Sequence, residues 1–142
     1  MIVLDTNVVS ELMRRRPEAA VLEWIDGERP SDLAITAVTA AELLHGVARL
    51  PNGARRRRLA AAVDGMLVED FAGRLLPFDG AAAVHYAQLV AARERAGRPI
   101  AVADGQIAAI CRHYGAALAT RNVRDFAATG VEVLDPWTAR AG

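Results

Sequence analysis

Four carboxylates lie in turns or in the first turns of expected helices: Asp5, Glu42, Asp104 and Asp125. Asp5 directly follows a short apolar segment, Glu42 closely follows a second one, and Asp125 follows another through residues 120–122. Two carboxylates about 5 Å apart repel each other by roughly 3 kcal/mol at an effective dielectric constant of about 20, and a divalent cation removes this repulsion. Oxygen ligands without a Cys or His partner favour Mg²⁺ or Mn²⁺. The four acids therefore predict a site for a hard divalent cation.

Each acid also has a purely structural explanation. Residues 39–42 have the spacing of a capping box, in which the glutamate bonds to the backbone of its own helix, and residues 122–125 are spaced similarly. Asp5 and Asp104 could act as acidic first-turn residues, worth about 0.3–1 kcal/mol each through the helix dipole. Capping is the commoner role for any one of them taken alone. The metal interpretation gains strength only if the fold crowds several acids at one end of a sheet.

Other chemistries lack their parts in this chain. Zinc is disfavoured because Cys111 is the single cysteine and the three histidines, at 45, 85 and 113, are scattered. The sequence contains no glycine-rich phosphate-binding loop and no Gly-x-Ser-x-Gly nucleophile motif. Phosphorelay receiver domains and aspartyl-phosphate phosphatases also gather acids at strand ends, but their pattern includes a lysine. This chain has no lysine, so those classes are excluded.

Composition bounds the class of protein. The chain has 142 residues, of which 53% are hydrophobic and 24% charged, as expected for one globular domain rather than a disordered chain. Its formal net charge is zero, which argues against a polybasic tail but allows local basic faces. The lone cysteine, the lack of a signal peptide and the lack of a long apolar run predict a cytoplasmic protein without a membrane span.

Short apolar segments that alternate with helical ones must position the acids. We expect strands at residues 2–4, 32–35, 74–78, 117–119 and 131–134. Helices are expected near residues 8–16, 17–25, 39–49, 54–68, 80–96, 102–114 and 123–128. The alternation predicts a single α/β domain over residues 1–142, with three α/β/α layers and a mostly parallel sheet. Ligand crevices form at the carboxyl ends of such strands, where Asp5, Glu42 and Asp125 fall, whereas Asp104 begins a helix.

The motifs that carry these acids occur in a fixed order: Asp5-Thr6-Asn7, then Thr39-Ala40-Ala41-Glu42-Leu43 with Gly46, then Pro99-Ile100-Ala101-Val102-Ala103-Asp104, then Thr120-Arg121-Asn122-Val123-Arg124-Asp125-Phe126. Together they resemble the PIN-domain family, and the resemblance runs over nearly the whole chain. More narrowly, the sequence resembles VapC-type toxins of bacterial toxin–antitoxin pairs. The resemblance implies a PIN-like α/β/α fold and a Mg²⁺-dependent endoribonuclease, with Mn²⁺ as a substitute, that a VapB-type antitoxin inhibits.

The resemblance also assigns site residues. Asp5, Glu42 and Asp104 match the family's acidic metal site, and the polar positions beside it match Thr6, Asn7 and Thr120. Some relatives have an aspartate where this chain has Asn122, so the fourth role falls to Asn122, to Asp125, or to both through water. Gly105 stands where alanine is common and is expected to loosen the first helical turn by up to about 1 kcal/mol.

Arginines are the candidates for RNA contact. Residues 14–16 and 55–58 are the densest basic runs, but successive helical residues point about 100° apart, so 55–58 cannot share one face. We interpret 55–58 as a solvated surface. Arg121 and Arg124 flank the proposed acids and are better placed to bind phosphate.

The expected function is cleavage of RNA by metal-activated water. The alternative is a non-catalytic PIN-like module that acts through protein contacts. The expected partners are RNA, the antitoxin and a second copy of the chain in a homodimer, with no membrane. The helices that carry Leu12, Met13, Leu22 and Ile25 are expected to leave an apolar groove for the antitoxin segment, with one of its arginines at the carboxylates. The alternative is that these four side chains belong to the ordinary core.

Overall fold

Short apolar segments form the five strands of one sheet in the computed structural model, which describes residues 1–138. The strands run in the order β3-β2-β1-β4-β5, and every neighbouring pair is parallel. Their bounds are β1 Ile2–Leu4, β2 Leu33–Thr36, β3 Leu75–Leu76, β4 Ala117–Ala119 and β5 Val133–Leu134. The predicted parallel α/β sheet is confirmed, whereas the expected domain end at residue 142 lies outside the described residues.

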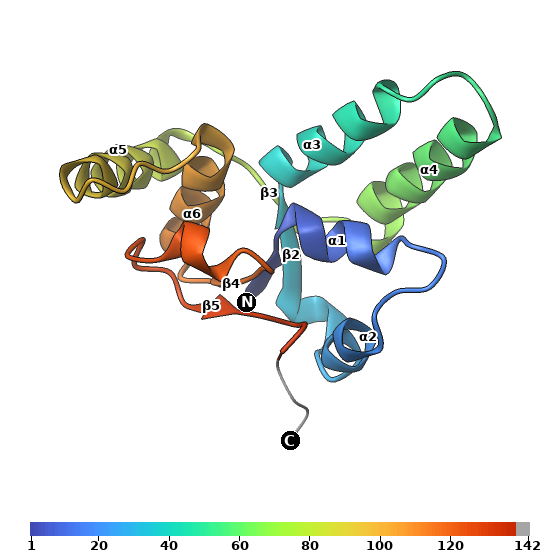
Figure 1. Ribbon diagram of the computed structural model, residues 1–142, viewed down its shortest axis with the longest axis horizontal. Coiled ribbons are helices and arrows are strands. Elements are labelled where there is room, and N and C mark those ends of the chain that lie inside the picture. The colour runs from blue at the N-terminus through green and yellow to red at the C-terminus, as the bar shows by residue number, and fades with distance from the viewer. Residues whose placement is uncertain (139–142) are drawn as a thin grey trace.

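Six α-helices cover the sheet and make the three predicted layers. They are α1 Thr6–Leu12, α2 Ala19–Asp26, α3 Ala37–Ala48, α4 Ala54–Gly65, α5 Gly80–Arg95 and α6 Val102–Tyr114. Figure 1 shows α5 and α6 on one side of the strands and α1, α2 and α4 on the other. None of the helices in residues 1–138 is long and apolar enough to cross a membrane.

Alternate strand residues enter opposite cores, as the two-residue period of a strand requires. Val3 and Leu118 belong to the hydrophobic cluster that includes α5 and α6. Their neighbours Leu4 and Ala119 belong to the cluster that includes residues of α1, α2 and α4. The central strands β1 and β4 are therefore covered on both faces, so polar groups reach solvent at their ends.

Several element boundaries differ from the sequence-based expectation. The third strand is two residues long, because Pro77 directly after it has no N–H to extend the ladder. The helix expected over 54–68 ends at Gly65 and continues as one π-helical turn, Met66–Asp70. The short helix expected over 123–128 is a 3₁₀ turn, Val123–Phe126.

Gly105 corrects a second expectation, because it brings two helices together rather than loosening one. It is buried within α6, where a Cβ atom would lie 3.0 Å from the ring of Tyr86 and 3.1 Å from Val90 of α5. The helix still begins at Val102 and runs unbroken to Tyr114. The glycine therefore gives α5 and α6 the close approach on which this side of the core is built.

A buried arginine fixes the loop that follows β4. Arg93 near the end of α5 is 5% exposed, and its Nη1 donates to the carbonyl oxygens of Asp125 (3.0 Å) and Ala127 (2.7 Å). Its Nε donates to the carbonyl of Arg98 at 2.6 Å. The guanidinium thus satisfies three backbone acceptors and holds the Val123–Phe126 turn against α5.

We expect Arg93→Met to lower the free energy of unfolding by about 2–3 kcal/mol, because it leaves these carbonyls without a donor. Chemical denaturation measures the loss. Arg95→Met is the matched control, since Arg95 is exposed on the same helix, and it should change stability by less than about 0.5 kcal/mol. Equal stability of the two variants would contradict the assigned role.

Candidate active site

Asp5 lies at the centre of the site, where β1 ends and α1 begins. It is the N-cap of α1 and is only 5% exposed. Its carboxylate accepts hydrogen bonds from the Thr6 backbone N (2.8 Å), Thr120 Oγ1 (2.7 Å) and Asn7 Nδ2 (3.3 Å). Burial raises the pKa of Asp5, and the three hydrogen bonds oppose that rise because they stabilise the charged form.

Glu42 meets the same site from α3. Thr36 at the end of β2 is the N-cap of α3, and its Oγ1 accepts from the backbone N of Thr39 at 3.1 Å. The capping-box interpretation of residues 39–42 is therefore wrong, because the helix begins one turn earlier. The exposed carboxylate of Glu42 instead accepts from Thr6 Oγ1 of α1 at 2.9 Å.

The segment after β4 supplies polar groups from the neighbouring strand end. Because β1 and β4 are adjacent, Thr120 reaches Asp5, and Asn7 Nδ2 lies 3.3 Å from Thr120 Oγ1. Asn7 Oδ1 accepts from the Arg121 backbone N at 3.2 Å, and Thr120 Oγ1 accepts from the Asn122 backbone N at 3.0 Å. The expected supporting residues thus form one network, which links α1 to the loop after β4.

Asp104 approaches from the first turn of α6 and is half-buried. Burial is the largest cause that raises its pKa to about 6, and the negative charges of Asp5, Asp125 and Glu42 contribute to the same rise in that order of importance. The acids are therefore close enough to repel one another. This mutual repulsion separates the site from four independent helix caps.

One hollow of about 510 Å³ collects these groups. We call it the acidic hollow; its lining includes Asp5, Glu42 and Asp104, with Thr6, Asn7, Ser10, Glu11 and Asn122. Asn122 lines the hollow, whereas Asp125 does not and acts on the other acids only through its charge. Arg121 also lines the hollow, and Arg124 does not.

The donor set of the hollow suits a hard divalent cation. Carboxylate and amide groups of the β1–α1 junction, α1, α3, α6 and the loop after β4 line it, and no histidine or cysteine of the described residues does. Within residues 1–138, no three acidic, histidine or cysteine side chains converge at ligand spacing. The acids thus surround the hollow, and binding a cation would require side chains to turn inward.

A second concave surface joins the acidic hollow. We call it the arginine groove: it measures about 710 Å³ between α1, α3 and α4, and its lining includes Met13, Leu43, Val47, Leu59 and Val63, with Arg14, Arg15, Arg16, Arg55 and Arg58. The groove therefore lies elsewhere than we expected, because only Met13 of the four named residues lines it. Leu12 and Ile25 instead pack against the core.

The groove also changes the interpretation of the run 55–58. Arg55 and Arg58 are one helical turn apart and face the groove together, whereas Arg56 pairs with Asn52 at 2.6 Å. Arg55, Arg57 and Arg58 are exposed to solvent, as expected, whereas Arg56 is half-buried. Two of the four arginines thus face the groove.

Trp137 is a wall of the acidic hollow that sequence reasoning missed as a site residue. The Arg121 guanidinium lies over its ring at 5.0 Å, a cation–π distance. The sequence places Trp137 just after the last expected strand, but its contact partner Arg121 lies 16 residues earlier, in the loop after β4, so spacing along the chain does not reveal the contact.

Comparison with known proteins decides the family. The sequence model of the PIN-domain family matches residues 2–132 of this chain. The chain belongs to the PIN-domain family. A relative named VapC ribonuclease Y4jK, from Sinorhizobium fredii, is 44% identical over 96% of this chain and 98% of its own. Toxin FitB of Neisseria gonorrhoeae is 42% identical over 96% of this chain and 99% of its own.

Solved structures agree with the family assignment. The crystal structure of FitAcB from Neisseria gonorrhoeae matches with a TM-score of 0.92 and 41% identity, over 98% of this chain and all of that one. These relatives identify the PIN domain as one of the VapC type, as the sequence motifs predicted.

We expect Asp104→Asn to stabilise the metal-free PIN domain. A carboxyl whose pKa is raised to about 6 by folding, from about 3.9 when unfolded, destabilises the fold above pH 6 and ceases to do so near pH 4. After discounting for solvent screening, the gain at pH 7.5 should be about 1 kcal/mol, shrinking towards pH 4. Denaturation in EDTA at both pH values measures it. Asp64→Asn, an exposed control, should show neither effect.

Proposed function

We propose that this PIN domain is a Mg²⁺-dependent endoribonuclease and the toxin of a VapBC-type pair. The observation that carries the proposal is the meeting of Asp5, Glu42 and Asp104 at one hollow, from the junction of β1 with α1, from α3 and from α6. The curated relative at 44% identity bears the name VapC ribonuclease, which supports RNA as the substrate.

The acids of the hollow would hold Mg²⁺, with Asn122 as an oxygen donor beside them. Bound Mg²⁺ would supply charge neutralisation at the phosphate and lower the pKa of a bound water molecule. Thr120 and Asn7 hold the Asp5 carboxylate in place, and Thr6 holds that of Glu42. Asp104, with its pKa raised to about 6, is mostly ionised at neutral pH and available as a ligand.

RNA contact at the hollow falls to Arg121. Its stacking on Trp137 restricts the guanidinium without using its hydrogen-bond donors, which leaves them free for a phosphate. Arg124 is exposed but lies outside the lining of the hollow, so its phosphate contact would be more distant.

The arginine groove is the proposed seat of the antitoxin. A segment with apolar side chains would cover the floor at Leu43 and Val47, and acidic side chains would pair with the arginines at the rim. The groove opens into the acidic hollow, where an arginine of the segment could occupy the place of Mg²⁺. A structure of a member of the VapBC family of toxin–antitoxin systems, from Mycobacterium tuberculosis, matches this chain with 30% identity and a TM-score of 0.69, which supports an antitoxin as the partner. Homodimer formation stays a prediction, to be checked by light scattering.

RNA cleavage tests the proposed activity. We expect the wild type to cut single-stranded RNA in Mg²⁺ and to leave 5′-phosphate and 3′-hydroxyl ends. EDTA should abolish this cleavage. A substrate with a 2′-deoxy nucleotide at the cut site should still be cut, because no histidine of the described residues lines the hollow to activate the 2′-hydroxyl. Asp5→Asn should abolish cleavage, whereas Asp64→Asn should retain it. Cyclic phosphate ends would contradict the mechanism, and lack of cleavage by the wild type would favour a non-catalytic module.

Growth and copurification test the partner. Expression alone should arrest growth, and co-expression of the small protein from the neighbouring reading frame should relieve the arrest. Gly46 lines the groove and has open space at its Cβ, so Gly46→Trp should weaken that complex by about tenfold or more. Gly65→Trp, outside the groove but also with open space at its Cβ, is the control. An unchanged affinity of the Gly46 variant would move the partner to another surface.

A further inference from the structure

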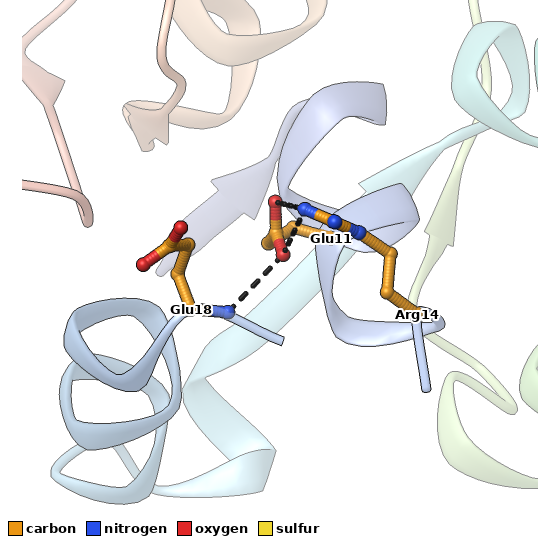
Figure 2. Close-up of polar contacts among 3 residues, drawn as sticks. All are labelled: Glu11, Arg14 and Glu18. Carbon is orange, nitrogen blue, oxygen red and sulfur yellow. Dashed lines mark hydrogen bonds and ion pairs between the residues drawn. The ribbon is translucent and has the colours of Figure 1, made fainter. Parts of the chain in front are cut away.

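An ion pair between a buried acid and an exposed arginine lies where the acidic hollow meets the arginine groove. Glu11 of α1 is 5% exposed, and both of its carboxylate oxygens lie 3.2 Å from Nη1 of Arg14. One of these oxygens also accepts from the backbone N of Glu18 at 3.1 Å, at the start of α2. Figure 2 shows the Glu11 carboxylate between Arg14 and Glu18. The acid is therefore fixed from two sides.

This pair leaves most of the Arg14 guanidinium unused. Nη1 makes the contacts with Glu11, whereas Nε and Nη2 make no hydrogen bond to any of residues 1–138. The Arg14 side chain is 62% exposed, so these donors face solvent. Guanidinium groups with free, directed donors are suited to bind phosphate oxygens.

The position of Arg14 decides which phosphate it can reach. It lines both the acidic hollow and the arginine groove, and only Thr6, Ser10 and Glu42 share that position. None of these three is basic. A nucleic-acid strand that passes from the acids into the groove would therefore meet Arg14 as the cation at the junction, followed by Arg15, Arg16, Arg55 and Arg58.

We propose that Arg14 binds a backbone phosphate of single-stranded RNA next to the scissile one, that Glu11 is its positioning residue, and that the arginine groove carries the adjoining stretch of RNA. The proposal rests on RNA being the substrate of the acidic hollow. Charge complementarity favours RNA here, because the groove adds five arginines beside a site that is otherwise acidic. The same arginines would face an acidic antitoxin segment, so RNA and antitoxin would compete for the groove.

The test measures binding without cleavage. In the Asp5→Asn background with Mg²⁺, fluorescence anisotropy gives the affinity for a short single-stranded RNA of mixed sequence as salt is varied. Arg14→Ala should weaken binding on the order of tenfold and reduce the slope of log affinity against log salt by about 0.7, the value for one phosphate on a single strand. Arg57→Ala is the control, because Arg57 is an exposed arginine of α4 that lines neither surface, and it should change both much less.

A double-mutant cycle tests the positioning role of Glu11. With Arg14 absent, Glu11→Gln should strengthen RNA binding, because it removes a negative charge near the strand. With Arg14 present, the same change should strengthen binding less or weaken it, because it also releases the guanidinium. The Arg14→Ala, Glu11→Gln double variant also avoids an unpaired buried acid, and circular dichroism should show it folded.

The outcomes distinguish failure of the proposed endoribonuclease function from failure of the proposed role of Arg14. If Asp5→Asn binds no RNA, both the proposed function and this proposal fail. If it binds RNA and Arg14→Ala has the affinity and salt slope of Arg57→Ala, this proposal is overturned while the endoribonuclease remains. Equal effects of Glu11→Gln with and without Arg14 would overturn the positioning role.

Discussion

A carboxylate held almost out of water at the end of the central strand is the constraint on which the other features depend. Asp5 stays compatible with burial because a backbone N–H and two side chains donate to it. Those donors come from both sides of the strand end, from the start of α1 and from the segment after β4. The hydrogen bonds to Asp5 therefore hold the start of α1 against the segment after β4. That contact brings Asn122 and Arg121 to the hollow.

Much of this arrangement follows from the sequence, because parallel strands end at one edge and their following residues must meet there. The positions of Asp5 and Glu42 are of this kind, whereas Asp104 follows a helix rather than a strand and is assigned to the site through the family resemblance. Contacts that depend on how helices pack against each other do not follow from the sequence in this way. The partner of Glu42 could not be predicted from the spacing 39–42, since the choice between its own backbone and Thr6 depends on how α3 sits against α1. The groove likewise depends on the angle between α3 and α4, which periodicity alone does not report.

Zero net charge conceals a strong separation of charge. Acids gather at the carboxyl ends of the strands, where burial and the charges of Asp5, Asp125 and Glu42 raise the pKa of Asp104, and arginines gather along the adjoining groove. Because Thr6, Ser10, Arg14 and Glu42 line both surfaces, the two regions of opposite sign are in direct contact. A ligand that bridges them must carry both kinds of group or bring a cation with it. This requirement is stricter than attraction to a uniformly basic face.

The helix start at Thr36 has a consequence for how the chain can vary in length. Thr39 and Glu42 lie one turn apart on α3 and face α1. Leu43, the next residue, is buried in the core. Inserting one residue between 36 and 42 would rotate the rest of α3 by about 100° and turn Glu42 away from the hollow. An insertion in the link between α3 and α4, residues 49–53, would not rotate Glu42 away from the hollow. Insertions and deletions should therefore be found in that link and be absent from residues 36–42, which connect β2 to Glu42.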